Sequence, residues 1–301
     1  MKEATIRSAV EQNKSAVKFF EGEKWLVFTG LLGVLLAGVC AVWVLMYGGP
    51  VAPDGNVSHA LSFNAALGIF LLSTAAITSF SDLGAKGRAF FRWSYILLAL
   101  YSYFAETVQN FRGVNPRFVK DGTPFDVSVG FIFAFVALLL ILSYLFLAIQ
   151  YFRRNVHMLR PELVRGIRYA MIAVLFSFAA GIWISVNQGR IVGLHGNIIW
   201  LHGLGFHALQ AMPVIAWLTE RTSLTTRARS RSIHIAGIFY LLGLLAIGWQ
   251  TYLGHSIFEW SAMSILVYGC FIISLATGLL VLQKAAGTLF VKKGSASRIS
   301  R

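Results

Sequence analysis

Eight long apolar runs, separated by short polar segments, dominate the pattern of the chain. Each run is long enough to cross about 30 Å of hydrocarbon at the ~1.5 Å rise per residue of an α-helix. The predicted spans are 25–47, 59–79, 89–109, 127–152, 167–188, 198–219, 233–253 and 261–284. The pattern therefore predicts an all-α, polytopic membrane helix bundle with eight transmembrane helices.

The composition indicates a surface that faces lipid rather than water. Of the 301 residues, 57% are hydrophobic and 13% are charged, whereas a soluble domain carries about 25% charge. We expect three regions: a cytoplasmic amphipathic segment 1–24, the transmembrane domain 25–284 and a basic cytoplasmic tail 285–301. The lipid bilayer is accordingly the first predicted partner.

The basic residues alternate between the segments that join the spans, and this alternation predicts an orientation. Lys and Arg are retained in the cytoplasm during insertion. With the N-terminus inside, all but four of the 26 basic residues fall on the cytoplasmic side, the four being Arg112, Arg117, Lys120 and Arg190. We predict a bacterial cytoplasmic (inner) membrane protein with both termini in the cytoplasm. Because the net charge of +14 sits at helix ends rather than on one patch, no nucleic-acid partner is expected.

Polar side chains inside the spans are the best guide to function, because ionisable and amide groups are costly in a bilayer. In this orientation they gather in the outer half, while the inner half carries little beyond hydroxyls, His234 and the cations at its rim. The alternative is that each of them only caps a helix end or satisfies a neighbour. The outer group comprises His59, Asn64, Glu106, Gln109, Arg112, His202, His207, Gln210 and Gln250.

The chemistry of this group suggests a site that opens to the outer face. Glu106 is predicted as a catalytic acid or base and His207 as a proton carrier, because a desolvated Glu and an imidazole both titrate near neutral pH. The sequence leaves the cofactor unknown, with haem and a divalent metal as the candidates. The residues predicted to bind cofactor or substrate are His202, Gln109, Gln210, Arg112, Asn64 and Gln250, and the predicted metal ligands are His59, His202 and His207. His202 and His207 are about 140° apart around a helix, which disfavours one ion bound by both.

The long outer loop after the third predicted span has a second interpretation. Glu106 and Gln109 are one turn apart and share a face. Arg112 or Arg117 is placed to pair with Glu106 or Asp126 in a buried ion pair that locks the loop over the bundle. The same arginines could instead bind an anionic group.

Two stretches, roughly residues 95–130 and 195–215, resemble an uncharacterised family of bacterial multi-pass membrane proteins. The resemblance lies in the Glu-x-x-Gln-x-x-Arg-Gly run that starts at Glu106 and in the His-Ala-Leu-Gln run that starts at His207. It implies no activity. The relatives carry a His near the position of Arg117, and this departure weakens a metal role for the loop.

A weak internal sequence repeat predicts two four-helix halves. His59-Ala60-Leu61 recurs as His207-Ala208-Leu209, an offset of 148, and Glu106-Thr107 resembles Gln250-Thr251, an offset of 144. This outline is similar to that of haem A synthase. The fourth and eighth predicted spans lack the His residues of a paired haem site, so the similarity is one of architecture.

Three functions remain open on the sequence alone. The first is a membrane enzyme that acts on a small or lipidic substrate, and the second is a small-molecule transporter or receptor. The third is a structural or accessory membrane protein. The apolar inner half counts against proton-coupled transport, and the sequence carries no P-loop, dinucleotide fingerprint or paired-His zinc helix. It does not set an oligomeric state.

Overall fold

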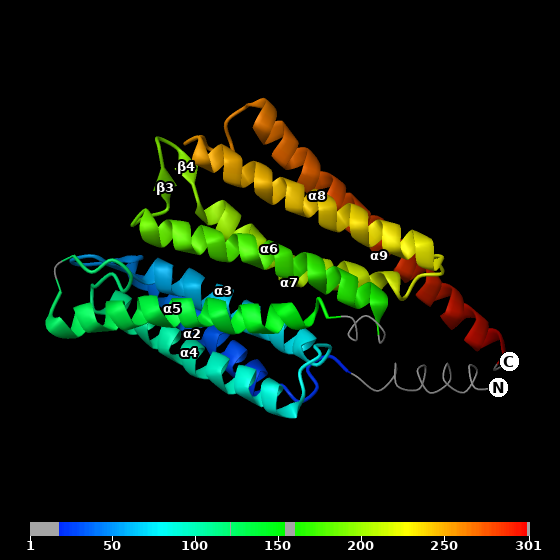
Figure 1. Cartoon of the computed structure of the whole chain (residues 1–301), viewed down its shortest axis with the longest axis horizontal. Helices are drawn as coiled ribbons and strands as arrows, with labels where there is room; N and C mark the ends of the chain where they lie inside the picture. Colours follow the sequence, from blue (N-terminus) through cyan, green and yellow to red (C-terminus); the bar gives the residue numbers. More distant parts are fainter. Residues whose placement is uncertain (1–17, 121, 154–159, 300–301) are drawn as a thin grey trace. The chain divides into compact units, whose positions relative to one another are not determined.

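The computed structural model describes residues 18–120, 122–153 and 160–299, with side chains through Thr288. These residues form eight α-helices and two short β-hairpins (Figure 1). The elements are α2 (Lys24–Tyr47), β1 (Pro50–Val51), β2 (Gly55–Asn56), α3 (Val57–Thr78), α4 (Ala85–Phe111), α5 (Pro124–Gln150), α6 (Pro161–Val186), β3 (Ile191–Val192), β4 (Gly196–Asn197), α7 (Ile199–Thr219), α8 (Thr226–Tyr252) and α9 (Ala262–Ile299). Each predicted span coincides with one helix.

Six of these helices, α2, α3, α5, α6, α8 and α9, are long and apolar enough to cross a membrane. Large apolar side chains stay exposed along them; on α2 these include Leu31, Leu35 and Val42. Such faces are stable against lipid rather than water. These features are those of an integral membrane protein with an all-α fold. The other two helices are not among these six: α4 carries Lys86, Arg88 and Arg92 in its first turns, and α7 is interrupted by His202, His207 and Gln210.

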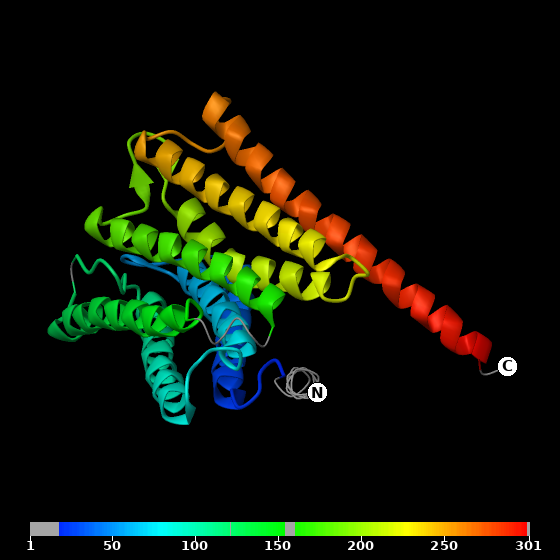
Figure 2. The same ribbon diagram turned by 45° about the vertical axis from the view of Figure 1, so that its right-hand side comes forward.

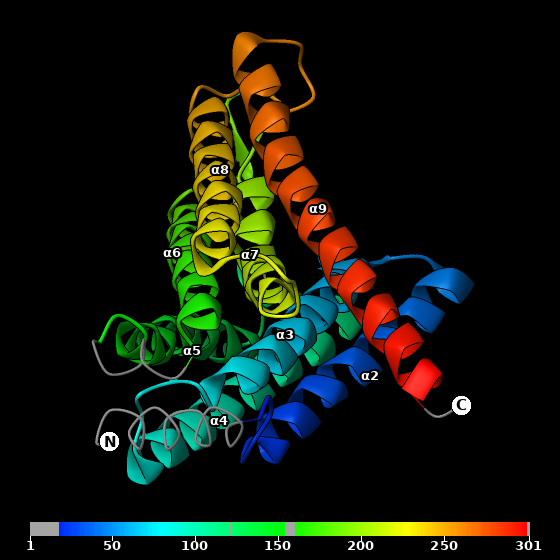
Figure 3. The ribbon, with the colours of Figure 1, turned by 90° about the vertical axis from the view of Figure 1, so that its right-hand side faces the viewer.

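The chain divides into two compact units of four helices each, in agreement with the predicted halves. Unit 1 is Met1–Arg153 and contains α2 to α5, and unit 2 is Arg154–Arg301 and contains α6 to α9. Within unit 2, α8 packs against both α6 and α9 (Figure 2). Within unit 1, α3 packs against α2 and α4 (Figure 3).

The two units repeat the same order of elements, and the hairpins and the third helices recur at an offset of 141 residues, whereas α6 begins 137 residues after α2 and α9 begins 138 residues after α5. The pairing of Pro50 with Asn56 in the first hairpin recurs as Ile191 with Asn197 in the second. Gly113 and Gly254, at the same offset, follow α4 and α8 with φ of 78° and 79°. The offsets of 148 and 144 that short sequence matches suggested are therefore wrong, because such matches arise by chance in apolar sequence.

Each hairpin docks on the end of the third helix of its own unit. The Asp54 amide donates to the Gly113 carbonyl at 2.8 Å, and the His195 amide donates to the Gly254 carbonyl at 3.0 Å. Glycine is needed in each hairpin, since a Cβ on Gly55 would lie 2.5 Å from the Asn110 carbonyl oxygen. Neither hairpin was predicted from the apolar pattern, although the Pro-Asp-Gly turn and the repeated Gly-Asn pair are turn signals in the sequence.

The two ends of the chain add little to this architecture. The predicted amphipathic segment falls mostly on residues 1–17, which lie outside the described residues. The predicted tail, 285–301, continues the α9 helix as far as Ile299.

Candidate functional site

The polar residues predicted around the end of α4 form a network of ion pairs in unit 1. Glu106 Oε1 accepts a hydrogen bond from Arg117 Nε at 2.5 Å, and Asp126 Oδ1 accepts one from Arg112 Nη1 at 2.6 Å. Both carboxylates are buried, whereas the two guanidinium groups are partly exposed. The predicted ion-pair lock over the bundle is therefore confirmed, in the pairing Glu106–Arg117 and Asp126–Arg112.

Gln109 joins the Asp126–Arg112 pair to α4. Its Nε2 donates to Asp126 Oδ1 at 2.9 Å, and its Oε1 accepts from Arg112 Nη1 at 2.5 Å. Asp126 also closes a capping box with Thr123 at the start of α5. Because both functional groups of the buried amide are used, Gln109 holds the loop between α4 and α5.

Asn64 and His59 lie on α3 in the same unit. Asn64 is fully buried, and its Nδ2 donates to Thr107 Oγ1 at 2.9 Å. Its Oδ1 has no hydrogen-bond partner among the described residues. His59, one turn earlier, lies on the exposed side of α3. Asn64 thus belongs to the α3–α4 contact next to Glu106, whereas His59 is outside it.

Gln250 occupies the position in unit 2 that Gln109 occupies in unit 1. It is buried in α8, and its Nε2 donates to the Ser256 carbonyl at 2.5 Å and to Ser264 Oγ at 2.9 Å. Ser264 belongs to the first turn of α9. Both glutamines therefore join the third helix of a unit to the following loop and to the start of the fourth helix. The ligand-binding role of both glutamines stays a prediction.

The remaining predicted residues lie on α7. His202 Nδ1 is 2.7 Å from the Ser177 carbonyl oxygen, which only accepts, so this nitrogen carries the proton. His207 is exposed, and its Nδ1 is 3.2 Å from Gln210 Oε1 of the same helix. One turn before His207, a Cβ on Gly203 would have no neighbouring atom within 4 Å. The helix therefore presents a polar, sterically open stripe through Gly203, His207 and Gln210.

The structure thus brings together Glu106, Gln109 and Arg112 in unit 1, and His207 and Gln210 in unit 2. The convergence of Glu106 with His202 and His207 stays a prediction, since these residues belong to different units. Within the described ranges, no group of three or more His, Cys, Asp or Glu side chains could hold a metal ion. The haem and metal assignments, including His59, His202 and His207 as ligands, likewise stay predictions.

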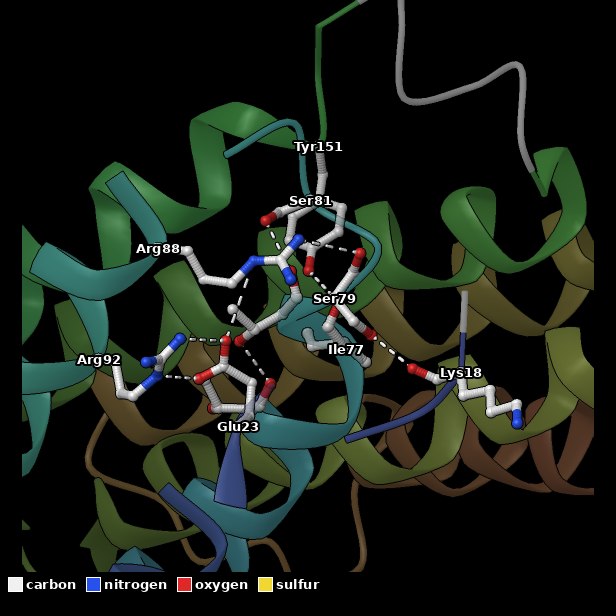
Figure 4. Close-up of polar contacts among 10 residues, drawn as sticks. Lys18, Glu23, Ile77, Ser79, Ser81, Arg88, Arg92 and Tyr151 are labelled. Atoms are coloured by element: carbon white, nitrogen blue, oxygen red, sulfur yellow. Dashed lines mark hydrogen bonds and ion pairs between the residues drawn. The ribbon is translucent and has the colours of Figure 1, made fainter. Parts of the chain in front are cut away.

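A buried charge cluster at the opposite end of unit 1 was missed by the sequence analysis (Figure 4). Glu23 is fully buried and accepts hydrogen bonds from Arg92 Nε at 2.8 Å and Nη2 at 3.3 Å. Arg88 Nε lies 3.9 Å from the same carboxylate. The hydropathy pattern placed Glu23 in the cytoplasmic segment and both arginines at the membrane rim. The available signal was the four-residue spacing of Arg88 and Arg92, which puts them on one face of α4.

Shallow depressions occur at equivalent places in the two units, between the hairpin tip and the loop after the third helix. The depression in unit 2 measures about 640 Å³ and is lined in part by His195, His255 and Glu259. His255 Nδ1 lies 3.0 Å from Glu259 Oε2. The Ser256 amide and the His255 side chain, which hydrogen bond to Glu259, lower the pKa of that carboxyl. The counterpart in unit 1 measures about 210 Å³ and is lined in part by Asp54 and Lys120.

Comparisons of the chain with protein-family models, with curated proteins and with solved structures give no match. The sequence resemblance to a family of bacterial membrane proteins therefore stays a prediction, and the site has to be interpreted from its own geometry.

Proposed function

We propose that the chain is an eight-span protein of the bacterial cytoplasmic membrane that binds a small or lipidic ligand through α7. Six helices have the length and composition of spans, and α4 and α7 would complete the set. The alternation of basic residues supports cytoplasmic termini. In that orientation, the ends that carry the two hairpins face outward.

The exposed imidazole of His207 is the observation that carries the proposal. His207 lies eight residues, about 12 Å, from the first residue of α7, so it is well inside the span. A polar side chain that faces hydrocarbon at this depth is unfavourable, and such groups mark ligand or substrate sites. Its hydrogen-bonding neighbour Gln210 comes from the same helix and leaves the other ring nitrogen available to a ligand.

The surroundings of His207 define the class of ligand. An imidazole and a primary amide recognise hydroxyl, carbonyl or carboxylate groups, and Gly203 leaves room for a flat ring or a lipid chain. Haem belongs to this class, because one exposed imidazole is sufficient as an axial ligand. A divalent ion held by protein ligands alone is less well supported, since it needs three or four of them.

The experiment is to identify what the purified full-length protein retains. We expect native mass spectrometry and the visible absorption spectrum to reveal a bound molecule that His207→Leu and Gln210→Leu lose. His234→Leu is the matched control, since His234 is also an exposed imidazole with one hydrogen-bonding neighbour, Tyr169. An identical set of bound molecules in the wild type and in all three variants would contradict the proposal.

A structural or accessory role is the second candidate, and the network around Glu106 favours it. A catalytic Glu106 would first have to be released from Arg117, and Gln109 and Arg112 hold Asp126 instead of a substrate. Under this alternative, single substitutions of Glu106, His202 and His207 would change stability alone. The ligand search on His207→Leu therefore separates the two candidates.

A further inference from the structure

The depression at the hairpin end of unit 2 combines a carboxylate with apolar side chains. Its lining consists of Gly193, Leu194 and His195 from the β3–β4 hairpin and Leu253, Gly254, His255 and Glu259 from the loop between α8 and α9. Leu194 is 85% exposed and Leu253 is 51% exposed, so apolar surface remains uncovered beside the carboxylate. The volume of about 640 Å³ is in the range of pockets that hold a small ligand.

The two segments that form the depression are fixed to each other and to α9. The His195 amide donates to the Gly254 carbonyl at 3.0 Å. A Cβ on Gly193 would lie 2.8 Å from Gly254 Cα, so the backbones of the hairpin and the loop touch. From α9, Tyr268 Oη donates to the Ile257 carbonyl of the loop at 2.8 Å. The fold therefore sets the shape of the depression before any ligand binds.

Glu259 supplies the carboxylate of this depression, and its charge has no permanent counter-charge. Its Oε1 accepts from the Ser256 amide at 3.1 Å, and its Oε2 lies 3.0 Å from His255 Nδ1. The imidazole of His195 is also close enough to act on this carboxyl electrostatically. Among the ion pairs of the described residues, none joins Glu259 to a lysine or an arginine. An imidazole is mostly neutral above about pH 7, so the charge of Glu259 is then available to a ligand.

The corresponding end of unit 1 differs in this respect. Its buried carboxylates, Glu106 and Asp126, each pair with an arginine. The smaller depression there is lined by a cation, Lys120, as well as by Asp54. Among the described residues that line the depression in unit 2, none is a lysine or an arginine. The depression in unit 2 is therefore both larger and negatively charged when its imidazoles are neutral.

We propose that this depression binds a primary ammonium group carried by an apolar molecule. Each oxygen of the Glu259 carboxylate has a further acceptor site beyond the hydrogen bond already made, and the side chain is 38% exposed. A carboxylate only accepts, so His255 Nδ1 carries the proton and Nε2 of the neutral ring is an acceptor. An ammonium group supplies three donors to these acceptors, and Leu194 and Leu253 offer apolar contact to the rest of the ligand.

Two sources share this chemistry, a soluble alkylamine and the headgroup of phosphatidylethanolamine. A metal ion is a poorer match, since no group of three His, Cys, Asp or Glu side chains in the described part of the chain could hold one. The depression is separate from the stripe on α7 that contains His207, so this proposal does not depend on the ligand proposed for α7.

The experiment titrates butylamine and 1-butanol into the purified full-length protein by isothermal titration calorimetry. The protein is in phosphatidylcholine nanodiscs near pH 7.5, where a primary amine is charged, and empty nanodiscs are the blank. We expect butylamine to bind about tenfold more tightly than 1-butanol, which has the same chain but no charge. Equal binding of the two would overturn the proposal, and this comparison needs no variant.

A pair of variants locates the site. Glu259→Gln removes the charge and keeps an oxygen that can accept from the Ser256 amide. We expect it to weaken butylamine binding about tenfold and to change 1-butanol binding less than about twofold. The matched control is Asp54→Asn, which removes the carboxylate of the depression in unit 1, and we expect less than about a twofold effect. Equal losses in both variants would overturn the proposal, because they would indicate general attraction of an amine to acidic groups.

Nanodiscs that contain phosphatidylethanolamine distinguish the two sources of the ammonium group. Weaker apparent binding of butylamine in these nanodiscs, with no such effect in Glu259→Gln, would support the lipid headgroup as the occupant. Unchanged binding of butylamine would support a soluble amine. An effect of phosphatidylethanolamine that is equal in the wild type and in Glu259→Gln would overturn the assignment to the headgroup.

Discussion

At the scale of single residues, the ion pairs explain why buried charged groups are tolerated where α4 meets α5 in unit 1. Glu106 is fully buried, yet its carboxylate accepts a hydrogen bond from Arg117 and lies 3.4 Å from Asn110 Nδ2. Removal of one member of such a pair leaves the other without its partner, and this is more damaging than loss of both. The residue therefore has a defined effect on stability whether or not it has a catalytic role.

We expect Glu106→Gln to destabilise the protein by about 1–3 kcal/mol. The lower part of the range for buried pairs applies, because the Arg117 side chain is 38% exposed and water screens it. Thermal unfolding of the purified protein in detergent measures the effect. Asp54→Asn, which neutralises an exposed carboxylate on the hairpin, is the control. Unchanged stability in Glu106→Gln would show that the ion pair contributes nothing.

The carboxyl of Glu259 provides a test that depends on pH. Its pKa is lowered by the hydrogen bond from the Ser256 amide and by His255, so the folded state prefers the charged form. The contribution to stability is therefore fully present above the unfolded pKa of about 4.3 and is lost as the pH falls through the folded pKa. We expect the wild type to lose more thermal stability than Glu259→Gln between pH 6 and pH 3, a window set by that unfolded pKa of about 4.3. Parallel pH profiles would contradict this expectation.

At the scale of helices and loops, the two buried glutamines perform the same task in both units. Gln109 binds the first turn of α5, and Gln250 binds the loop and the first turn of α9. The groups that contact the two glutamines differ. Gln109 contacts an ion pair, whereas Gln250 contacts serines. The shared feature is the buried amide, which donates across the turn from the third helix to the fourth.

Each glutamine variant serves as the control for the other. We expect Gln250→Leu to increase hydrogen exchange in the loop 253–261 about tenfold, and Gln109→Leu to do so in the loop 113–123, because loss of one hydrogen bond is worth about 1–2 kcal/mol. Hydrogen exchange followed by mass spectrometry measures both loops in each variant. Increased exchange of both loops in either variant would indicate general destabilisation and would contradict the local role.

The helices were predictable from the sequence, whereas the connections between them were not. Long apolar runs predicted the positions of all eight helices, since a helix satisfies its own backbone polar groups where water is excluded. The hairpins escaped prediction because two-residue strands carry no periodicity. The position of Glu23 escaped because hydropathy does not detect a carboxylate paired with Arg92 from a distant helix. The pairing of Glu106 was anticipated because both partners lie in one loop-and-helix segment.

At the scale of the whole molecule, the repeat and the charge pattern both support the proposed eight-span topology. If all four helices of each unit cross the membrane, the chain enters the second unit on the same side as it entered the first. Both hairpins would then lie outside, and the loops before α4 and α8 would lie inside with the basic residues. If only the six most apolar helices crossed the membrane, the two units would no longer have equivalent topologies.

Cysteine labelling in intact cells tests this topology most directly. Cys40 and Cys270 are buried and are first replaced by Ser, so that single cysteines can be introduced at Asp54, His195, Gly84 and Arg227. We predict that a membrane-impermeant maleimide labels cysteines at Asp54 and His195 in intact cells. Cysteines at Gly84 and Arg227 should react only after permeabilisation. Labelling of the two hairpins from opposite sides of the membrane would contradict the arrangement of eight spans in two equivalent units.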